Sequence, residues 1–126
     1  SAIFVINIHV PDSNSEIIDA SLSMAGRDAL DLAASEPAID NLNHSSKLTE
    51  LLSNNSLEDA CIFIEDGLPL TYKSNCWVAR NSGPLQISNF NGNPVGNSVT
   101  SYIVLQDSGT LWTVSLDVWN QGGGSL

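Results

Sequence analysis

Hydrophobic and polar residues alternate at the start of the chain in the pattern that is typical of a β-strand. Within residues 1–10 apolar side chains stand at every second position, while Asn7 and His9 share the opposite side. Successive strand side chains point to opposite faces, so one face of this strand would be apolar. The residues expected to make contacts are Ile3, Phe4, Val5, Ile6, Ile8 and Val10.

The period then lengthens to between three and four residues, which predicts an amphipathic helix over about residues 14–34. Ser13-Asn14-Ser15-Glu16 has the form of a capping box at its start. The Ala-rich apolar stripe suits close packing on a sheet, and a shorter helix is expected at 46–53, with Leu48, Leu51 and Leu52 pointing inward. The stripe of the first helix consists of Ile18, Leu22, Ala25, Ala29 and Leu32.

From Ala60 the period returns to two, which predicts antiparallel strands. The clearest signal is a hairpin of 99–106 with 110–119, joined by a turn at Asp107-Ser108-Gly109. Trp112, Val114, Leu116 and Val118 would line its buried face. The other expected strands are 61–64, a small hairpin of 71–73 with 76–80, and 85–87, followed by an Asn-rich loop at 89–97.

These elements indicate one α+β domain over residues 1–126. Behind the N-terminal apolar segment, one long amphipathic helix would pack on an antiparallel β-sheet. A chain of 126 residues is long enough to bury a core of its own. The expected parts are the apolar segment 1–10, a helical half 11–58, a β half 59–120 and a flexible Gly-rich tail 121–126.

The net charge of −10 lies entirely in the first half of the chain. Residues 1–66 hold twelve carboxylates and two basic residues, whereas residues 67–126 hold two of each. The chain therefore lacks the clustered Lys and Arg that bind nucleic acid. A neutral surface rich in Ser, Thr and Asn is common on secreted β domains, and it favours an extracellular or cell-surface location.

Two cysteines and two glycosylation-acceptor tripeptides also bear on whether the protein is extracellular. Cys61 and Cys76 would form a disulfide in an oxidising compartment, and the alternative is a pair of buried free thiols. Asn43 and Asn54 each begin an Asn-x-Ser tripeptide, the acceptor of N-glycosylation. The disulfide is favoured because the polar surface composition and the glycosylation tripeptides also indicate a location outside the cytoplasm.

No set of residues has the spacing of a catalytic or metal site. His9 and His44 lack neighbours at ligand spacing, and no Ser lies in a nucleophile elbow. The paired carboxylates are typical of a solvated helix face. We therefore expect no catalytic residue, no metal and no cofactor. An alternative function is a secreted carbohydrate-binding module that stacks sugars on Trp77 or Trp119, although core packing also explains both residues.

Three roles remain open for the apolar segment at residues 1–10. It could be a strand of its own sheet, a strand donated to a neighbouring subunit, or the outer end of an anchor helix whose remainder lies upstream. Alone it falls short of the ~20 apolar residues that span a membrane.

The order of elements resembles the extracytoplasmic part of type IV pilin-like proteins, including archaeal pseudopilin-type chains. The matching stretches are the apolar segment 3–10, the helix 20–33 and the final strand 111–119. The resemblance implies a non-enzymatic structural subunit of a pilus-like or cell-surface filament. Such a subunit would associate with copies of itself or with related subunits, through the N-terminal segment.

Overall fold

The computed structural model describes residues 13–38 and 46–120, with side chains from Asp19 onward. In these ranges helices precede strands, which confirms the α+β class. The elements are α1 (Ser13–Ser35), α2 (Lys47–Ser53), α3 (Leu57–Glu65), β1 (Tyr72–Arg80), β2 (Gln86–Asn89), β3 (Ser98–Asp107) and β4 (Thr110–Asn120).

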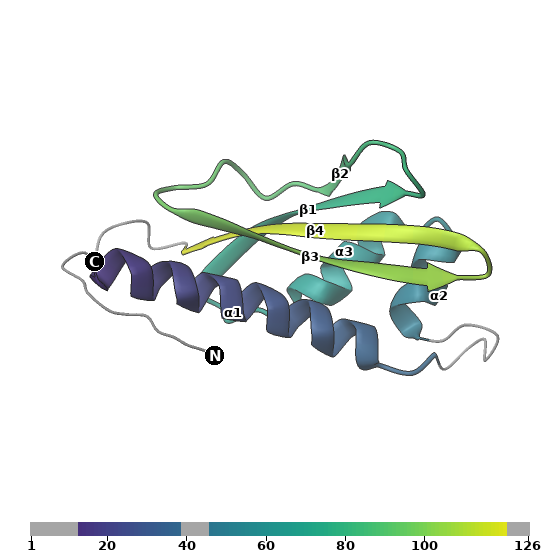
Figure 1. Cartoon of the computed structure of the whole chain (residues 1–126), viewed down its shortest axis with the longest axis horizontal. Coiled ribbons are helices and arrows are strands. Elements are labelled where there is room, and N and C mark those ends of the chain that lie inside the picture. The colour runs from purple at the N-terminus through teal and green to yellow at the C-terminus, as the bar shows by residue number, and fades with distance from the viewer. Residues whose placement is uncertain (1–12, 39–45, 121–126) are drawn as a thin grey trace.

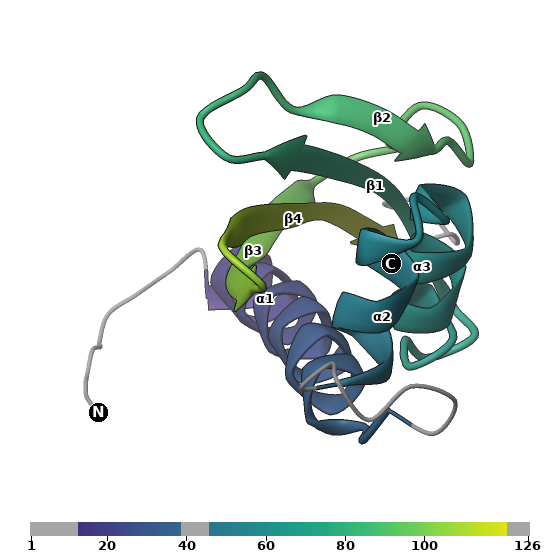
Figure 2. The same cartoon turned by 90° about the vertical axis from the view of Figure 1, so that its right-hand side faces the viewer.

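The strands form one antiparallel sheet in the order β2-β1-β4-β3. All three helices lie on the same face of it, with α1 along β3 and β4 (Figure 1). Seen from the end, α2 and α3 sit beside α1 on that face (Figure 2). The start of α1 and the end of β4 lie at the same end of the molecule (Figure 1).

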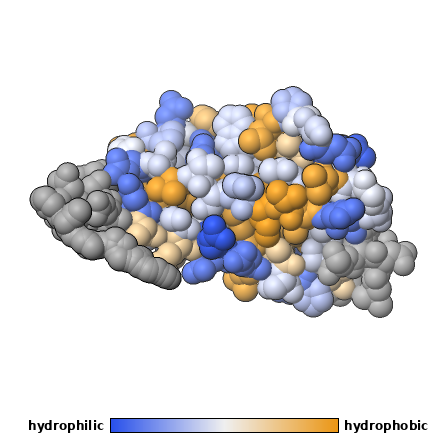
Figure 3. Space-filling view, viewed as in Figure 1, coloured by the Kyte–Doolittle hydropathy of each residue, from blue (hydrophilic) through white to orange (hydrophobic). Residues whose placement is uncertain are grey.

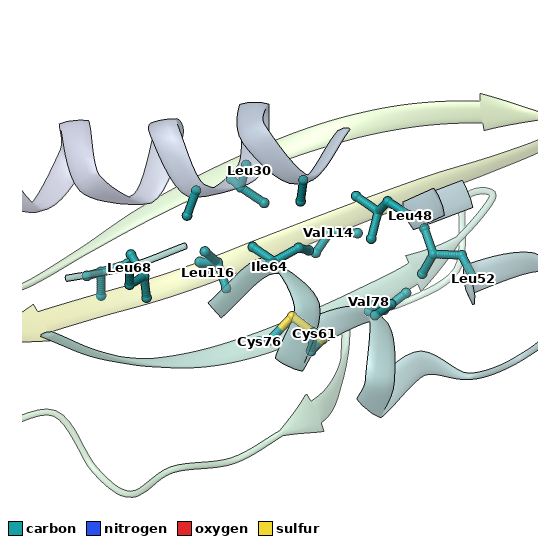
Figure 4. Packing of buried hydrophobic residues seen from close by; sticks show 14 of the residues in the cluster. Leu30, Leu48, Leu52, Cys61, Ile64, Leu68, Cys76, Val78, Val114 and Leu116 are labelled. Atoms are coloured by element: carbon teal, nitrogen blue, oxygen red, sulfur yellow. A yellow bond between two sulfur atoms is a disulfide. The ribbon is translucent and has the colours of Figure 1, made fainter. Parts of the chain in front are cut away.

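The core fills the space between the helices and the sheet. Ile64 of α3 lies close to Val114 and Leu116 of β4, while Leu48 and Leu52 of α2 close one end (Figure 4). All five side chains are fully buried. Burial of this apolar surface is the main favourable contribution to the stability of the fold.

The buried face of α1 agrees with the predicted stripe only in part. Leu22 and Ala29 are buried, but Leu32 is 62% exposed, and Leu30 and Ala33 face the core instead. The predicted stripe has an average spacing of 3.5 residues, which falls behind the 3.6 residues of a helical turn. By Leu32 the stripe has therefore rotated away from the sheet.

Gly26 brings α1 close to the sheet. A Cβ atom built at Gly26 would lie 3.0 Å from Ser101 Oγ and 3.3 Å from Val118 Cγ2. The helix thus approaches β3 and β4 where it has no side chain. A glycine in a helix interior costs about 1 kcal/mol relative to alanine, and here the close packing offsets that cost.

Residues 61–64 are helical, so the strand predicted there is wrong. They belong to α3, with Cys61 and Ile64 buried and Ile62 41% exposed. A short apolar run fits a buried strand and a buried helix equally, and the pattern alone does not separate them. The sheet consequently begins at Tyr72, and the boundary expected between residues 58 and 59 falls inside α3.

The hairpin predicted from 71–73 with 76–80 is also wrong, because these residues form the single strand β1. β1 pairs with β4 over its whole length, from Tyr72 opposite Asn120 to Arg80 opposite Trp112. Ser74 and Asn75 continue this ladder, so the chain does not turn between them.

The remaining elements agree with the sequence. Ser46 caps α2, and its hydroxyl accepts a hydrogen bond from the Thr49 backbone N–H at 3.1 Å. β2 lies within one or two residues of the predicted strand. The β3–β4 turn holds Ser108 at φ 52° and Gly109 at φ 84°, the two positive values that a type I′ turn requires.

Candidate functional site

The predicted assembly segment lies entirely outside the residues that the structure describes. Residues 3–10, which include Ile3, Phe4, Val5, Ile6, Ile8 and Val10, lie outside the described residues, as do Asn43 and both histidines. Asn54 is described, and it is exposed at the C-terminal end of α2. The Asn54 side chain is therefore accessible to a glycosylating enzyme, and its glycosylation stays a prediction.

The expected disulfide is present, and it joins α3 to β1. The Cα atoms of Cys61 and Cys76 are 5.8 Å apart, and both residues are fully buried. Figure 4 shows the bond between the helix and the strand, below Ile64. The disulfide therefore ties the helical layer to the sheet instead of closing a hairpin. Such bonds persist in oxidising compartments, which is consistent with an extracellular location.

The two tryptophans that were candidates for sugar stacking differ in burial. By strand alternation both lie on the face of the sheet opposite to the helices. Trp119 is only 2% exposed and presents no ring face to a ligand, whereas Trp77 is half-buried. Trp77 stands opposite Ser115, which in turn stands opposite Tyr102, so two aromatic residues flank a small one.

β3 is the longer edge strand of the sheet. It has ten residues, whereas β2 at the other edge has four. Residues 98–106 contain no charged residue, proline or glycine, and they pair with β4 without a register shift. Edge strands are usually protected by lysines, prolines or bulges. β3 has none of these devices.

Apolar side chains gather along this edge. Tyr102 is 67% exposed and Val104 is 48% exposed, while Ile103 and Leu105 are partly buried against the core. Figure 3 shows an orange patch over the part of the molecule where the C-terminal half of β3 runs in Figure 1. An uncharged edge beside an apolar patch is a surface suited to pairing with another strand.

A second feature is a partly buried polar network around Glu65, the last residue of α3. Its carboxylate accepts hydrogen bonds from Ser74 Oγ at 2.5 Å, from Asn89 Nδ2 at 2.5 Å and from Asn91 Nδ2 at 3.3 Å. These donors belong to β1, to β2 and to the residues after β2. Glu65 thus joins three separate parts of the chain.

Asn75 extends the same network along β1. Its Nδ2 group donates to the Gly92 carbonyl oxygen at 2.8 Å, and its Oδ1 atom accepts from the Asn91 backbone N–H at 2.6 Å. Together with Glu65, it fixes the start of the loop at residues 90–97, which crosses from β2 to β3 (Figure 1). This network is not predicted from the sequence, where the only local signal is the density of Asn in the loop.

A cavity of about 320 Å³ lies beside Glu65, with Asp66, Tyr72 and Lys73 among its lining residues. Burial raises the pKa of the Glu65 carboxyl, as does the charge of Asp66, against the opposing effect of the hydrogen bonds from Ser74 and Asn89. A carboxyl with a raised pKa in a cavity is a possible acid–base group. Both oxygens of Glu65 already accept hydrogen bonds, so an anchoring role explains this site best.

The pH dependence of stability tests this role. Because the pKa of Glu65 is higher in the folded protein than in the unfolded chain, the folded state holds the proton more tightly. Its contribution to stability is complete below the ordinary value of 4.5 and is lost as the pH rises through the folded pKa. Relative to the Glu65→Gln variant, the wild type is expected to lose stability as the pH rises.

Urea unfolding of both proteins between about pH 4 and about pH 7 measures this difference. The comparison with Glu65→Gln removes the contribution of the other carboxylates, which titrate in both proteins. A difference in the free energy of unfolding that stays constant over this range would contradict the prediction.

Comparison with known proteins identifies no relative. No protein-family model matches the chain, and no curated protein or solved structure is significantly similar to it. Within residues 13–38 and 46–120, no helix has the length and apolar character needed to cross a membrane. Nor do three or more His, Cys, Asp or Glu side chains of the described part gather closely enough to hold a metal ion.

Proposed function

We propose that this chain is a non-enzymatic structural subunit of a pilus-like or other cell-surface filament. The observation that carries the proposal is the edge of β3, a ten-residue strand that no described strand covers. Because residues 98–106 lack charges and prolines and pair with β4 without a bulge, this edge is open to pairing with another chain. Monomeric proteins usually protect or cover edge strands of this kind.

Two further observations support this function. The disulfide between Cys61 and Cys76 suits a protein that works outside the cytoplasm. The alternating apolar residues at 3–10 have the pattern of a strand that needs a partner. The carbohydrate-binding alternative has less support, because Trp119 is buried in the sheet.

Deletion of residues 1–10 tests the proposed function. The purified full chain is expected to form filaments that are visible by electron microscopy, and the shortened chain is expected to stay monomeric. Deletion of residues 121–126 is the matched control, because that Gly-rich tail is not expected to mediate assembly. A full chain that forms no filaments would overturn the proposed function, and filaments that persist unchanged without residues 1–10 would show that this segment is not the subunit contact.

A further inference from the structure

We infer that the outer edge of β3 accepts residues 3–10 of a second copy of the chain as an added strand. This inference rests on the proposed function and names the partner of the exposed edge. It joins an edge that no described strand covers to a segment with the sequence of a strand.

The hydrogen-bonding pattern of the β3–β4 hairpin identifies the groups that are free at this edge. Asp107 and Thr110 flank a two-residue turn, so they form a hydrogen-bonded pair, and pairing then alternates along the strands. The bond from the Asn81 backbone N–H to the Leu111 carbonyl oxygen agrees, since it directs Leu111 toward β1. Backbone groups of the even-numbered β3 residues, Tyr102 and Val104 among them, therefore point outward.

Residues 3–10 fit this edge in length and in charge. Eight residues in a strand span about 26 Å, which matches most of a ten-residue partner. Both the segment and residues 98–106 are free of Asp, Glu, Lys and Arg, although the chain carries a net charge of −10. Pro11 then ends the segment, because proline cannot continue the ladder.

The short connection to α1 favours a second copy over the same chain. Only Pro11 and Asp12 separate the segment from the start of α1. To pair with β3 of its own copy, the segment would run antiparallel to β3, reverse direction and cross from the sheet layer to the helix layer. Packed layers lie about 10 Å apart, and the three Cα–Cα steps from Val10 to Ser13 reach about 10 Å only when fully extended, which leaves no residue for the two changes of direction. Pairing with a neighbour's β3 avoids this restriction.

The added strand would also cover the apolar patch. On the side where Tyr102 and Val104 are exposed, it would place the row Phe4, Ile6, Ile8 and Val10 next to them. Main-chain hydrogen bonds would supply part of the affinity and the apolar row the rest, as in other cases of strand addition.

Proline at position 104 tests the edge without disturbing the hairpin. The Val104 backbone N–H points outward, so Val104→Pro removes a donor from the free edge and leaves the β3–β4 ladder intact. The matched control is Val104→Thr, which keeps the branched shape and the N–H. Val104→Pro is expected to raise the concentration needed for assembly at least about tenfold over Val104→Thr, through lost main-chain hydrogen bonds.

Mixing two variants then identifies the occupant. The Val104→Pro chain keeps its donor segment but not its acceptor edge, whereas the chain without residues 1–10 keeps only the edge. At a concentration where Val104→Thr assembles and Val104→Pro does not, each is expected to be monomeric alone, and together they are expected to form a 1:1 dimer by size-exclusion chromatography with light scattering. Circular dichroism checks that each variant is folded, and Tyr102→Lys replaces Val104→Pro should the latter fail to fold.

The outcomes separate this inference from the proposed function. If deletion of residues 1–10 abolishes filaments but Val104→Pro assembles like Val104→Thr, the acceptor site is wrong and the filament function stands. A mixture that stays monomeric would overturn pairing between copies. If filaments persist unchanged without residues 1–10, the named occupant is wrong and the filament function stands, whereas a full chain that forms no filaments overturns both.

Discussion

The double variant Cys61→Ala, Cys76→Ala is expected to lose about 3 kcal/mol of stability, the value that the chain-entropy account gives for a loop of this size. The two cysteines are 15 residues apart, so the bond restricts the unfolded chain appreciably. Both side chains are also fully buried, and removing the sulfur atoms leaves small cavities in the core. Urea unfolding of the oxidised wild type and of the variant measures the loss.

Reduction of the wild-type protein provides the control for this variant. Reduced Cys61 and Cys76 keep their volume but not their bond, so the reduced protein isolates the contribution of the cross-link from that of the cavities. We expect the reduced protein to be intermediate in stability between the oxidised wild type and the double variant. A double variant within about 1 kcal/mol of the oxidised protein would show that the bond contributes little to the fold.

Trp119→Ala is expected to lower the free energy of unfolding by about 3–5 kcal/mol, the range for deleting a large buried aromatic side chain. Trp119 is 2% exposed although it lies on the sheet face without helices. It stands opposite Lys73 on β1 and Ser98 on β3, near the end where residues 90–97 cross the sheet. Thermal and urea unfolding of the purified variant measure the effect.

Trp77→Ala is the matched comparison for this variant. Trp77 lies on the same face of the sheet but is half-buried, so its replacement is expected to cost less, below about 2 kcal/mol. Equal stability of Trp119→Ala and the wild type would mean that Trp119 does not pack in the sheet. That result would restore Trp119 as a candidate for ligand stacking.

The sequence predicted the elements whose causes are local. The β3–β4 hairpin was found because Ser108 and Gly109 suit a turn with two positive φ angles, and because apolar and polar residues alternate on either side. The helix expected at 46–53 was predicted from its local apolar spacing and is present as α2. Each of these elements is fixed by residues close together in the chain.

The elements that were missed depend on contacts between distant residues. The run at 61–64 became helical because its Cys61 and Ile64 side chains face the sheet while Ile62 faces solvent, and this choice is made by packing. Glu65 obtains its three donors from residues 9, 24 and 26 positions later in the chain. No local pattern carries information over such separations, so the polar network could not be predicted.

The strand order β2-β1-β4-β3 has a consequence for the order of folding. The central pair of strands joins Arg80 to Trp112 and Tyr72 to Asn120, residues 32 and 48 positions apart, so its closure costs more chain entropy than that of the β3–β4 hairpin. Cys61 and Cys76 are separated by only 15 residues. In an oxidising compartment, the disulfide can therefore hold α3 against β1 before β4 pairs with β1. The chain then samples fewer conformations before the sheet is complete.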